Sequence, residues 1–433
     1  MNILTESPRY SCALGGALST AKALHRVIPI LHCGPGCGMM LYNGQNFIAG
    51  YSGGGYVGGA TVPSTNTYER DIVFGAEKRL RQTIASTIEV MDGDLYVVLT
   101  GCTAEIIGDD VPSIVAEYAD KNVPVAHAST GGFSGTNYHG YEKLWEALAQ
   151  QVAVAGPREP HLVNLFGMVP AQDIYWLGNT EEIARLLGLL GLTVNTFVTQ
   201  RQGIEQVKQS ARAALNIVLS PWLAEGVLAR YQQKFGVPSL RYPGPPIGPT
   251  ATAEFLRAVA AALNLEHAVV ERVIAAEDQY TYDYFDRAGM IFTGFGIQHR
   301  IAVIGDSSTV TGVLRFLVND FSQIPAVAVI TDAPPEAHRP AIIQTLTQLE
   351  YAAPPPVVFT SDQWSVAQAV KAAGATYILG SSLDKEIAQD LGVPQLSISF
   401  PVSDRLVLNR AYAGYRGSIT LVEDFISPCV AAL

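Results

Sequence analysis

The chain has 433 residues, 48% of them hydrophobic, which is enough for two or three cores at the usual domain size of about 100–200 residues. Its formal net charge of -11 and its lack of a Lys/Arg cluster argue against nucleic acid as a partner, because nucleic-acid-binding surfaces are basic. No apolar stretch reaches the roughly 18 residues of a membrane-spanning helix, and the N-terminus lacks a signal-peptide pattern, so we expect a cytoplasmic protein without a membrane segment.

The first third of the chain alternates apolar strands, glycine or proline turns, and helices. Residues 94–100 form an apolar run that predicts a buried parallel strand, and Cys102 follows it directly. Open α/β sheets place their ligands at the carboxyl ends of strands, so Cys102 is expected where such folds do chemistry. A helix is predicted from Asp109 onward, and a short strand at 123–127 leads into a glycine-rich loop at 131–136.

Two further units of the same kind follow. Residues 155–160 contain glycine and prolines and predict a domain linker, and Thr180 provides a capping signal for the helix that follows it. Further strand-like runs occupy residues 161–167, 216–219, 299–306, 326–330 and 376–380. The pattern predicts an α/β fold of three Rossmann-like, doubly wound parallel-sheet domains, with bounds 1–157, 158–290 and 291–433.

Three of the five cysteines, Cys12, Cys37 and Cys102, lie on glycine-flanked turns beside apolar runs. An iron–sulfur cluster needs thiolates that converge from separate loops, with backbone amides free to hydrogen-bond its sulfides, and glycine permits that close approach. These three residues therefore predict a cluster ligand set. Cys33 is a further possible ligand by spacing, but it also closes an apolar run, and Cys429 is interpreted as structural.

The other polar motifs are better explained by structure than by chemistry. His32 ends the strand before the second cysteine turn and is interpreted as a structural histidine, with donation to a cluster as the alternative. Glu105, Asp109 and Asp110 are typical of a helix N-terminus, where acidic side chains are stabilising, although a role as proton carriers is the alternative. No G-x-x-x-x-G-K-[ST] motif occurs, so any use of ATP is expected to lie in a partner.

Longer motifs resemble the nitrogenase component 1 superfamily over nearly the whole chain. They are the three cysteine segments, residues 63–75, and the ending formed by 400–405 and 414–417. The segment around Cys102 and the ending look more like β subunits than α subunits, so the resemblance implies a β-type subunit.

Members of this superfamily pair α and β subunits around an eight-iron [8Fe-7S] P-cluster, to which each subunit contributes three cysteines. The resemblance implies that Cys12, Cys37 and Cys102 supply half of these ligands within an α2β2 heterotetramer. It also implies a homodimeric, ATP-binding reductase with a [4Fe-4S] cluster, which passes electrons through the P-cluster to an active-site cofactor in the α subunit. A β-subunit hydroxyl can join the ligands, and the alignment places Thr136 there with Ser134 nearby, while loop capping is the alternative.

The α subunits hold their cofactor with one cysteine and one histidine in later domains, and the only late cysteine here is Cys429, so this chain is not expected to hold that cofactor. The chain begins 11 residues before Cys12, which favours an alternative nitrogenase or a nitrogenase-like reductase. The chain looks most similar to methylthio-alkane reductase, which cleaves C–S bonds of small thioethers for sulfur salvage. A vanadium or iron-only nitrogenase β subunit that reduces N2 is the alternative.

Three other classes stay open at this point. A cofactor-assembly scaffold shares the fold, although such β-like chains usually keep fewer of the cysteines. A tetrapyrrole reductase subunit would use a simpler [4Fe-4S] cluster, and a three-domain sugar-nucleotide transferase would hold no iron.

Overall fold

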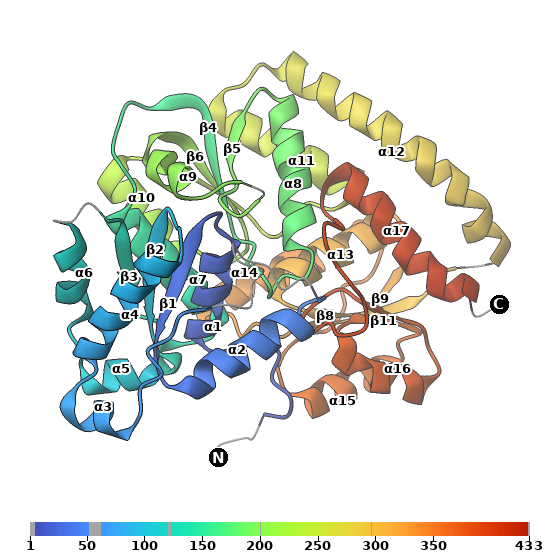
Figure 1. The fold of residues 1–433 in the computed structure, drawn as a ribbon. Coiled ribbons are helices and arrows are strands. Elements are labelled where there is room, and N and C mark those ends of the chain that lie inside the picture. The colour runs from blue at the N-terminus through green and yellow to red at the C-terminus, as the bar shows by residue number, and fades with distance from the viewer. Residues whose placement is uncertain (1–4, 52–61, 120–122, 200, 296, 432–433) are drawn as a thin grey trace.

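Three separate parallel β-sheets organise the computed structural model, which describes residues 5–51, 62–119, 123–199, 201–295 and 297–431. Figure 1 shows the three sheets side by side with helices around them. The first sheet has the order β1-β2-β3, where β1 is Val27–His32, β2 is Leu95–Thr100 and β3 is Val125–Ala128. The predicted strand before Cys102 is therefore the central strand of this sheet, and every residue of β2 is buried.

Helices surround the first sheet and carry the cysteine turns. They are α1 (Ala13–Ala23), α2 (Pro35–Phe47), α3 (Glu69–Phe74), α4 (Glu77–Val90), α5 (Cys102–Ile107), α6 (Val111–Ala119), the 3₁₀ helix η1 (Gly132–Ser134) and α7 (Asn137–Gln151). Helix α1 packs directly on α7, and a side chain at Gly16 or Gly140 would collide with the main chain of the other helix. Because glycine allows this close approach, α1 is fixed against α7 just beyond Cys12.

The second sheet has the order β5-β4-β6-β7, with all neighbours parallel. Its strands are β4 (Glu159–Phe166), β5 (Thr193–Asn195), β6 (Ala213–Leu219) and β7 (Ser239–Tyr242). Its helices are α8 (Trp176–Leu189), α9 (Ile204–Gln209), η2 (Ser210–Arg212), α10 (Glu225–Phe235), α11 (Gly248–Leu263) and the 29-residue α12 (His267–Phe295), which packs against α11 and α17 and runs along one side of the molecule (Figure 1).

The third sheet has the order β10-β9-β8-β11-β12, again parallel throughout. Its strands are β8 (Arg300–Gly305), β9 (Ile324–Ile330), β10 (Val357–Phe359), β11 (Tyr377–Gly380) and β12 (Gln395–Ser397). The helices are α13 (Ser307–Asn319), η3 (Glu336–His338), α14 (Arg339–Thr347), α15 (Gln363–Ala373), η4 (Ser382–Asp384), α16 (Lys385–Leu391) and α17 (Gly414–Ala431). The predicted α/β fold with three parallel sheets is confirmed.

The three sheet regions share one apolar core, in which Leu31 of β1, Phe166 of β4 and Val303 of β8 belong to the same cluster. Helix α17 follows the third sheet in sequence but packs on α8 and α11 beside the second. Since buried contacts cross the predicted bounds at 157/158 and 290/291, those bounds stay a prediction. None of the helices in the described part of the chain combines the length and hydropathy that crossing a bilayer requires.

Candidate metal centre

Each of the three predicted cysteine ligands lies at the start of a helix. Cys12 is the N-cap residue of α1, Cys37 is the third residue of α2, and Cys102 is the first residue of α5. The first amide N–H groups of a helix lack partners within it and carry partial positive charge, so they can donate hydrogen bonds to a metal-bound sulfur or to a cluster sulfide. The turns that the sequence marked with glycine are therefore places where sulfur can bind a metal as an anion.

Cys12 and Cys102 meet across Gly132. The Gly132 amide donates a hydrogen bond to Cys102 Sγ at 3.1 Å. A Cβ on Gly132 would lie 3.0 Å from Cys102 Sγ and 3.5 Å from Cys12 Sγ, so a side chain there would crowd the Cys102 sulfur. Glu105 holds this loop in place, because its Oε1 accepts hydrogen bonds from the Gly131 amide at 2.7 Å and from the Thr100 hydroxyl at 2.6 Å.

Cys37 is paired with Cys33. The Cys33 side chain is fully buried and donates a hydrogen bond to the Cys37 sulfur, which lowers the pKa of Cys37 to about 6. The same contact, together with burial, raises the pKa of Cys33. Cys37 is therefore the thiolate of the pair and Cys33 the proton donor, a role for Cys33 that its spacing alone did not indicate.

Removing the Cys33 thiol is expected to make Cys37 a weaker acid. In the metal-free, reduced chain, Cys33→Ala should raise the pKa of Cys37 from about 6 toward the usual thiol value of about 8.5, because the hydrogen bond to the thiolate is lost. The pH dependence of iodoacetamide alkylation at Cys37, followed by mass spectrometry of its peptide, measures this shift. Cys33→Ser keeps a donor and should keep the pKa low, and an unshifted alkylation profile in Cys33→Ala would contradict the pairing.

The three cysteine side chains do not surround a single position that one metal ion could occupy. Within the described residues, no three His, Cys, Asp or Glu side chains surround a position that a single metal ion would occupy. Three thiols on separate helix starts, with an amide directed at one of the sulfurs, instead fit one side of a multi-iron cluster whose other ligands come from elsewhere. That these residues bind iron stays a prediction, and the donor set is consistent with it.

Thr136 and Ser134, the two predicted hydroxyl candidates, have different surroundings. The Ser134 hydroxyl donates to the Gly131 carbonyl at 2.6 Å and so closes its own loop. Thr136 pairs through its main chain with Cys12, and its hydroxyl lies 3.1 Å from Nδ1 of His139. His139 was not found by sequence reasoning. The feature of the sequence that marks this position is Gly135. A side chain is excluded there because φ is 138° and a Cβ would collide with the His139 ring.

His32 and Asp109 form a buried pair behind the cysteines. His32 Nε2 lies 3.0 Å from Asp109 Oδ2, and its Nδ1 lies 3.1 Å from the Thr65 hydroxyl. Asp109 Oδ1 also accepts a hydrogen bond from the Ala76 amide at 3.0 Å. Burial lowers the pKa of His32, so the ring is neutral and links β1 to the segments after α3 and α5. This geometry agrees with a structural histidine.

The surface around the cysteine turns is unusually apolar. Phe74 is 81% exposed, Met40 76% and Ile106 75%. With Met39, Val73 and Phe133, they lie on α2, α3, α5 and η1, the elements that carry Cys37 and Cys102 or lie next to them. A monomer rarely exposes so many large apolar side chains from neighbouring elements, so this face has the character of a protein interface.

The comparison with protein families covers the three cysteines and most of the rest of the chain. The model of the nitrogenase component 1 type oxidoreductases matches residues 12–429, from the first cysteine of the set to Cys429. The chain belongs to this family. The suspected superfamily is thereby confirmed, and with it the oxidoreductase class.

Individual relatives of this family member are β chains. The vanadium-iron protein β chain of Trichormus variabilis is 25% identical, over 95% of this chain and 91% of the relative. The molybdenum-iron protein β chain of Clostridium pasteurianum is 23% identical, over 96% of this chain and 92% of the relative. A solved structure of nitrogenase Cp1 at pH 6.5 has a TM-score of 0.82 at 21% identity and covers all of this chain and 94% of its own, which shows the same fold.

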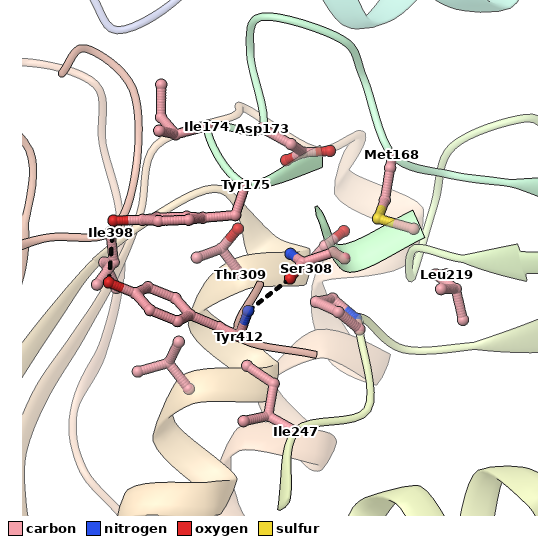
Figure 2. A pocket seen from close by; sticks show the side chains of 13 residues that line it. Met168, Asp173, Ile174, Tyr175, Leu219, Ile247, Ser308, Thr309, Ile398 and Tyr412 are labelled. Atoms are coloured by element: carbon pink, nitrogen blue, oxygen red, sulfur yellow. Dashed lines mark hydrogen bonds between the residues drawn. The ribbon is translucent and has the colours of Figure 1, made fainter. Parts of the chain in front are cut away.

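A small cavity of this nitrogenase component 1 family member lies between the second and third sheet regions. Figure 2 shows it beside Tyr175 and Tyr412, whose hydroxyls are 3.0 Å apart, and the Tyr412 amide donates to Asn179 Oδ1 at 2.7 Å. Its volume is about 20 Å³, which is room for one water molecule and no more. It is not a substrate site.

Asp173, which is partly buried, lines this cavity, and its charge interacts with those of two fully buried carboxylates, Asp306 and Asp332. Asp332 Oδ2 accepts hydrogen bonds from the Ser307 hydroxyl at 2.6 Å and from Trp222 Nε1 at 2.8 Å, while its Oδ1 has no partner among the described residues. Burial, and then the charge of Asp306, raise the pKa of Asp332 to about 6. Burial also raises the pKa values of Asp173 and Asp306.

Asp332→Asn is expected to stabilise the protein at neutral and alkaline pH. Because the folded-state pKa lies above the unfolded one, the stability that Asp332 contributes is present below pH 4 and lost as the pH rises through about 6. The side-chain amide of Asp332→Asn does not ionise, so the variant avoids the loss of stability that Asp332 causes at high pH. The free energy of unfolding should therefore rise by about 2 kcal/mol at pH 8 and stay unchanged at pH 4. Urea titrations at the two pH values measure it.

Asp362→Asn is the matched control. Asp362 caps the exposed start of α15, and hydrogen bonds from Ser365 lower its pKa, so its contribution is present above pH 4 and lost as the pH falls. The control should therefore weaken the protein at pH 8. A loss of stability at pH 8 in Asp332→Asn would contradict the expectation.

Proposed function

We propose that this chain is the β-type subunit of a nitrogenase-like reductase in the cytoplasm, and that Cys12, Cys37 and Cys102 supply half the ligands of an [8Fe-7S] P-cluster shared with an α-type subunit. The observation that carries the proposal is the placement of all three thiols at helix starts, with the Gly132 amide directed at the Cys102 sulfur. The family assignment and the β-chain relatives support it.

Each residue of the centre has its own part in holding such a group. Cys12, Cys37 and Cys102 would bind iron as thiolates. The Gly132 amide and the Cys33 thiol donate hydrogen bonds to two of those sulfurs, and such bonds are a main control of cluster potential. When bound, the cluster would supply one-electron transfer without bond breaking. The catalytic step would lie on the α subunit.

The exposed apolar face around the cysteines supports the partner part of the proposal. A half set of ligands needs a second chain, and Met40, Phe74 and Ile106 offer it an apolar contact. We propose an α-type subunit there, in an α2β2 heterotetramer. A homodimeric ATP-binding component with a [4Fe-4S] cluster would deliver the electrons.

For the substrate we propose a small thioether, reduced as by methylthio-alkane reductase. The balanced reaction takes two electrons and two protons, breaks one C–S bond, and releases methanethiol and a hydrocarbon. The proposal rests on overall sequence likeness. N2 reduction is the second candidate, because the β-chain relatives described above belong to nitrogenases.

Anaerobic purification of the complete complex tests the function. About eight irons per αβ pair, counted in a preparation that lacks the α-subunit cofactor, would support the P-cluster. About four would favour the tetrapyrrole-reductase type, and an absence of iron would contradict the proposal. Product assays on the active complex then separate the substrates, because methanethiol with hydrocarbon indicates a thioether and ammonia indicates N2.

A further inference from the structure

Lys22 is a buried cation without a counter-ion in the described part of the chain. Its side chain on α1 is 9% exposed, and its Nζ donates a hydrogen bond to Gln45 Oε1 of α2 at 3.1 Å. Gln45 is neutral, and its Nε2 donates in turn to the Gly15 carbonyl at 3.2 Å. An ammonium carries more N–H donors than one amide oxygen can satisfy, so Lys22 is incompletely paired.

The charge of Lys22 persists near neutral pH. Burial lowers the pKa of its amine to about 8, so the protonated form still predominates. Lysines are rarely buried without a partner, because an ammonium that leaves water without meeting an anion is costly. Residues 52–61, which lie outside the described residues and precede Val62 in the sequence, contain no Asp or Glu. The counter-ion therefore does not come from that segment.

Lys22 lines a cavity of about 340 Å³. Helices α1 and α2 form two of its walls, and Val62, Ser64 and Asn66 contribute a third. Among the described residues that line the cavity, Lys22 is the only one that carries a charge. The volume is many times the share of one water molecule in the liquid, about 30 Å³, so a carboxylate fits together with the side chain that bears it.

The cavity borders the apolar face that surrounds the cysteines. Met39 and Tyr42 line it from α2 and are both exposed, and Met40 follows Met39 on the same helix. A partner brought here by apolar contacts would exclude water around Lys22 and so strengthen an ion pair with it. A free anion would have this one cation to hold it, in a chain whose formal net charge is -11. The surroundings therefore favour an anion that belongs to the partner.

We propose that an acidic side chain of the α-type subunit enters this cavity and forms an ion pair with Lys22. The inference rests on the proposed function, which supplies the partner, and adds the chemistry that this partner presents. Lys22 then helps to select the partner, because a chain without the carboxylate would leave the cation buried and unpaired.

Removing the charge tests the inference. The dissociation constant between the full chain and the α-type subunit, both taken from the purified complete complex, is measured by surface plasmon resonance. Lys22→Met should weaken association by at least about tenfold, mainly through faster dissociation. Lys234→Met is the matched control. Lys234 also donates hydrogen bonds to neutral acceptors, the Ala149 and Gln150 carbonyls, but it lies on α10, so association should stay unchanged.

Urea unfolding of the isolated chain separates a lost contact from a damaged fold. Lys22→Met removes a buried charge that is unpaired in the isolated chain, so its urea midpoint should be unchanged or higher. A lower midpoint would overturn the inference, because Lys22 would then serve the fold of this chain. Equal association of wild type and Lys22→Met would overturn it as well. Failure of the folded wild-type chain to bind an α-type subunit would overturn the proposed function itself.

Inorganic phosphate is the probe for a free anion. Equilibrium dialysis of phosphate against the complete complex should show no binding that depends on Lys22. Phosphate bound by the wild-type complex and lost in Lys22→Met would overturn the inference, because a free anion would then occupy the cavity.

Discussion

Cys102→Ala is expected to abolish cluster assembly and reductase activity in the complex. Cys102 begins α5, and its sulfur accepts a hydrogen bond from the Gly132 amide, so the variant removes a proposed iron ligand together with this main-chain contact. A cluster shared between two chains cannot replace a missing thiolate with water and keep its stability. Iron content and visible absorption of the anaerobically purified complex measure the loss. Unchanged iron content would defeat the ligand assignment.

Two further variants separate ligand loss from general damage. Cys429→Ala removes a thiol that lies 3.4 Å from His299 Nε2 in the third sheet region, and it should leave the iron content unchanged. Gly132→Ala keeps every thiol but places a Cβ 3.0 Å from Cys102 Sγ. It should lower iron occupancy without lowering the helix content seen by circular dichroism. Full occupancy in Gly132→Ala would contradict the close approach.

Asp384→Ala is expected to destabilise the protein by about 3–5 kcal/mol, because it leaves a buried guanidinium without its counter-ion. Arg9 Nη1 and Nη2 donate to the two Asp384 oxygens at 2.7 and 2.6 Å, and both side chains are 0% exposed. Nη1 also donates to the Ser381 hydroxyl at 3.0 Å. The Arg9 carbonyl accepts a hydrogen bond from Gln172 Nε2 at 2.9 Å, so this segment is fixed to the second and third sheet regions at once.

Urea denaturation of the chain measures the effect. Glu271→Ala breaks the exposed Arg257–Glu271 pair and should cost much less than Asp384→Ala, because water screens an exposed pair. The double variant Arg9→Met/Asp384→Leu removes both buried charges and should recover most of the loss, as apolar replacements of buried pairs commonly do. A cost for Asp384→Ala no larger than that of Glu271→Ala would show that the pair does not hold the fold.

Local patterns in the sequence predicted the sheets and the cysteine turns. The apolar run before Cys102 is the buried strand β2, and the glycine beside each cysteine lies at or near a helix start. Apolar runs bounded by glycine are read from a few neighbouring residues, so prediction works there. The domain bounds and the ligand roles stay predictions, since neither follows from the backbone alone.

Long-range contacts were not readable from the sequence. Thr180 was expected to begin its helix, yet α8 starts at Trp176, and the Thr180 hydroxyl donates to the Trp176 carbonyl inside the helix at 2.6 Å. The low pKa of Cys37 depends on a hydrogen bond from the Cys33 thiol. The sequence showed Cys33 as the end of an apolar run and gave no sign of this contact. The Arg9–Asp384 pair depends on burial that only the assembled fold supplies.

The Arg9–Asp384 pair also sets an order of events during biosynthesis. Arg9 lies three residues before Cys12, and Asp384 is 375 residues beyond Arg9. At roughly 5–20 residues per second, a ribosome needs on the order of 20–75 s to make the stretch between them. Until then the segment leading to Cys12 lacks its anchor. The segment that precedes the proposed iron ligand Cys12 therefore gains this anchor only in the finished chain, whereas the packing of α1 on α7 and the Cys12–Thr136 bridge need only the first third of it.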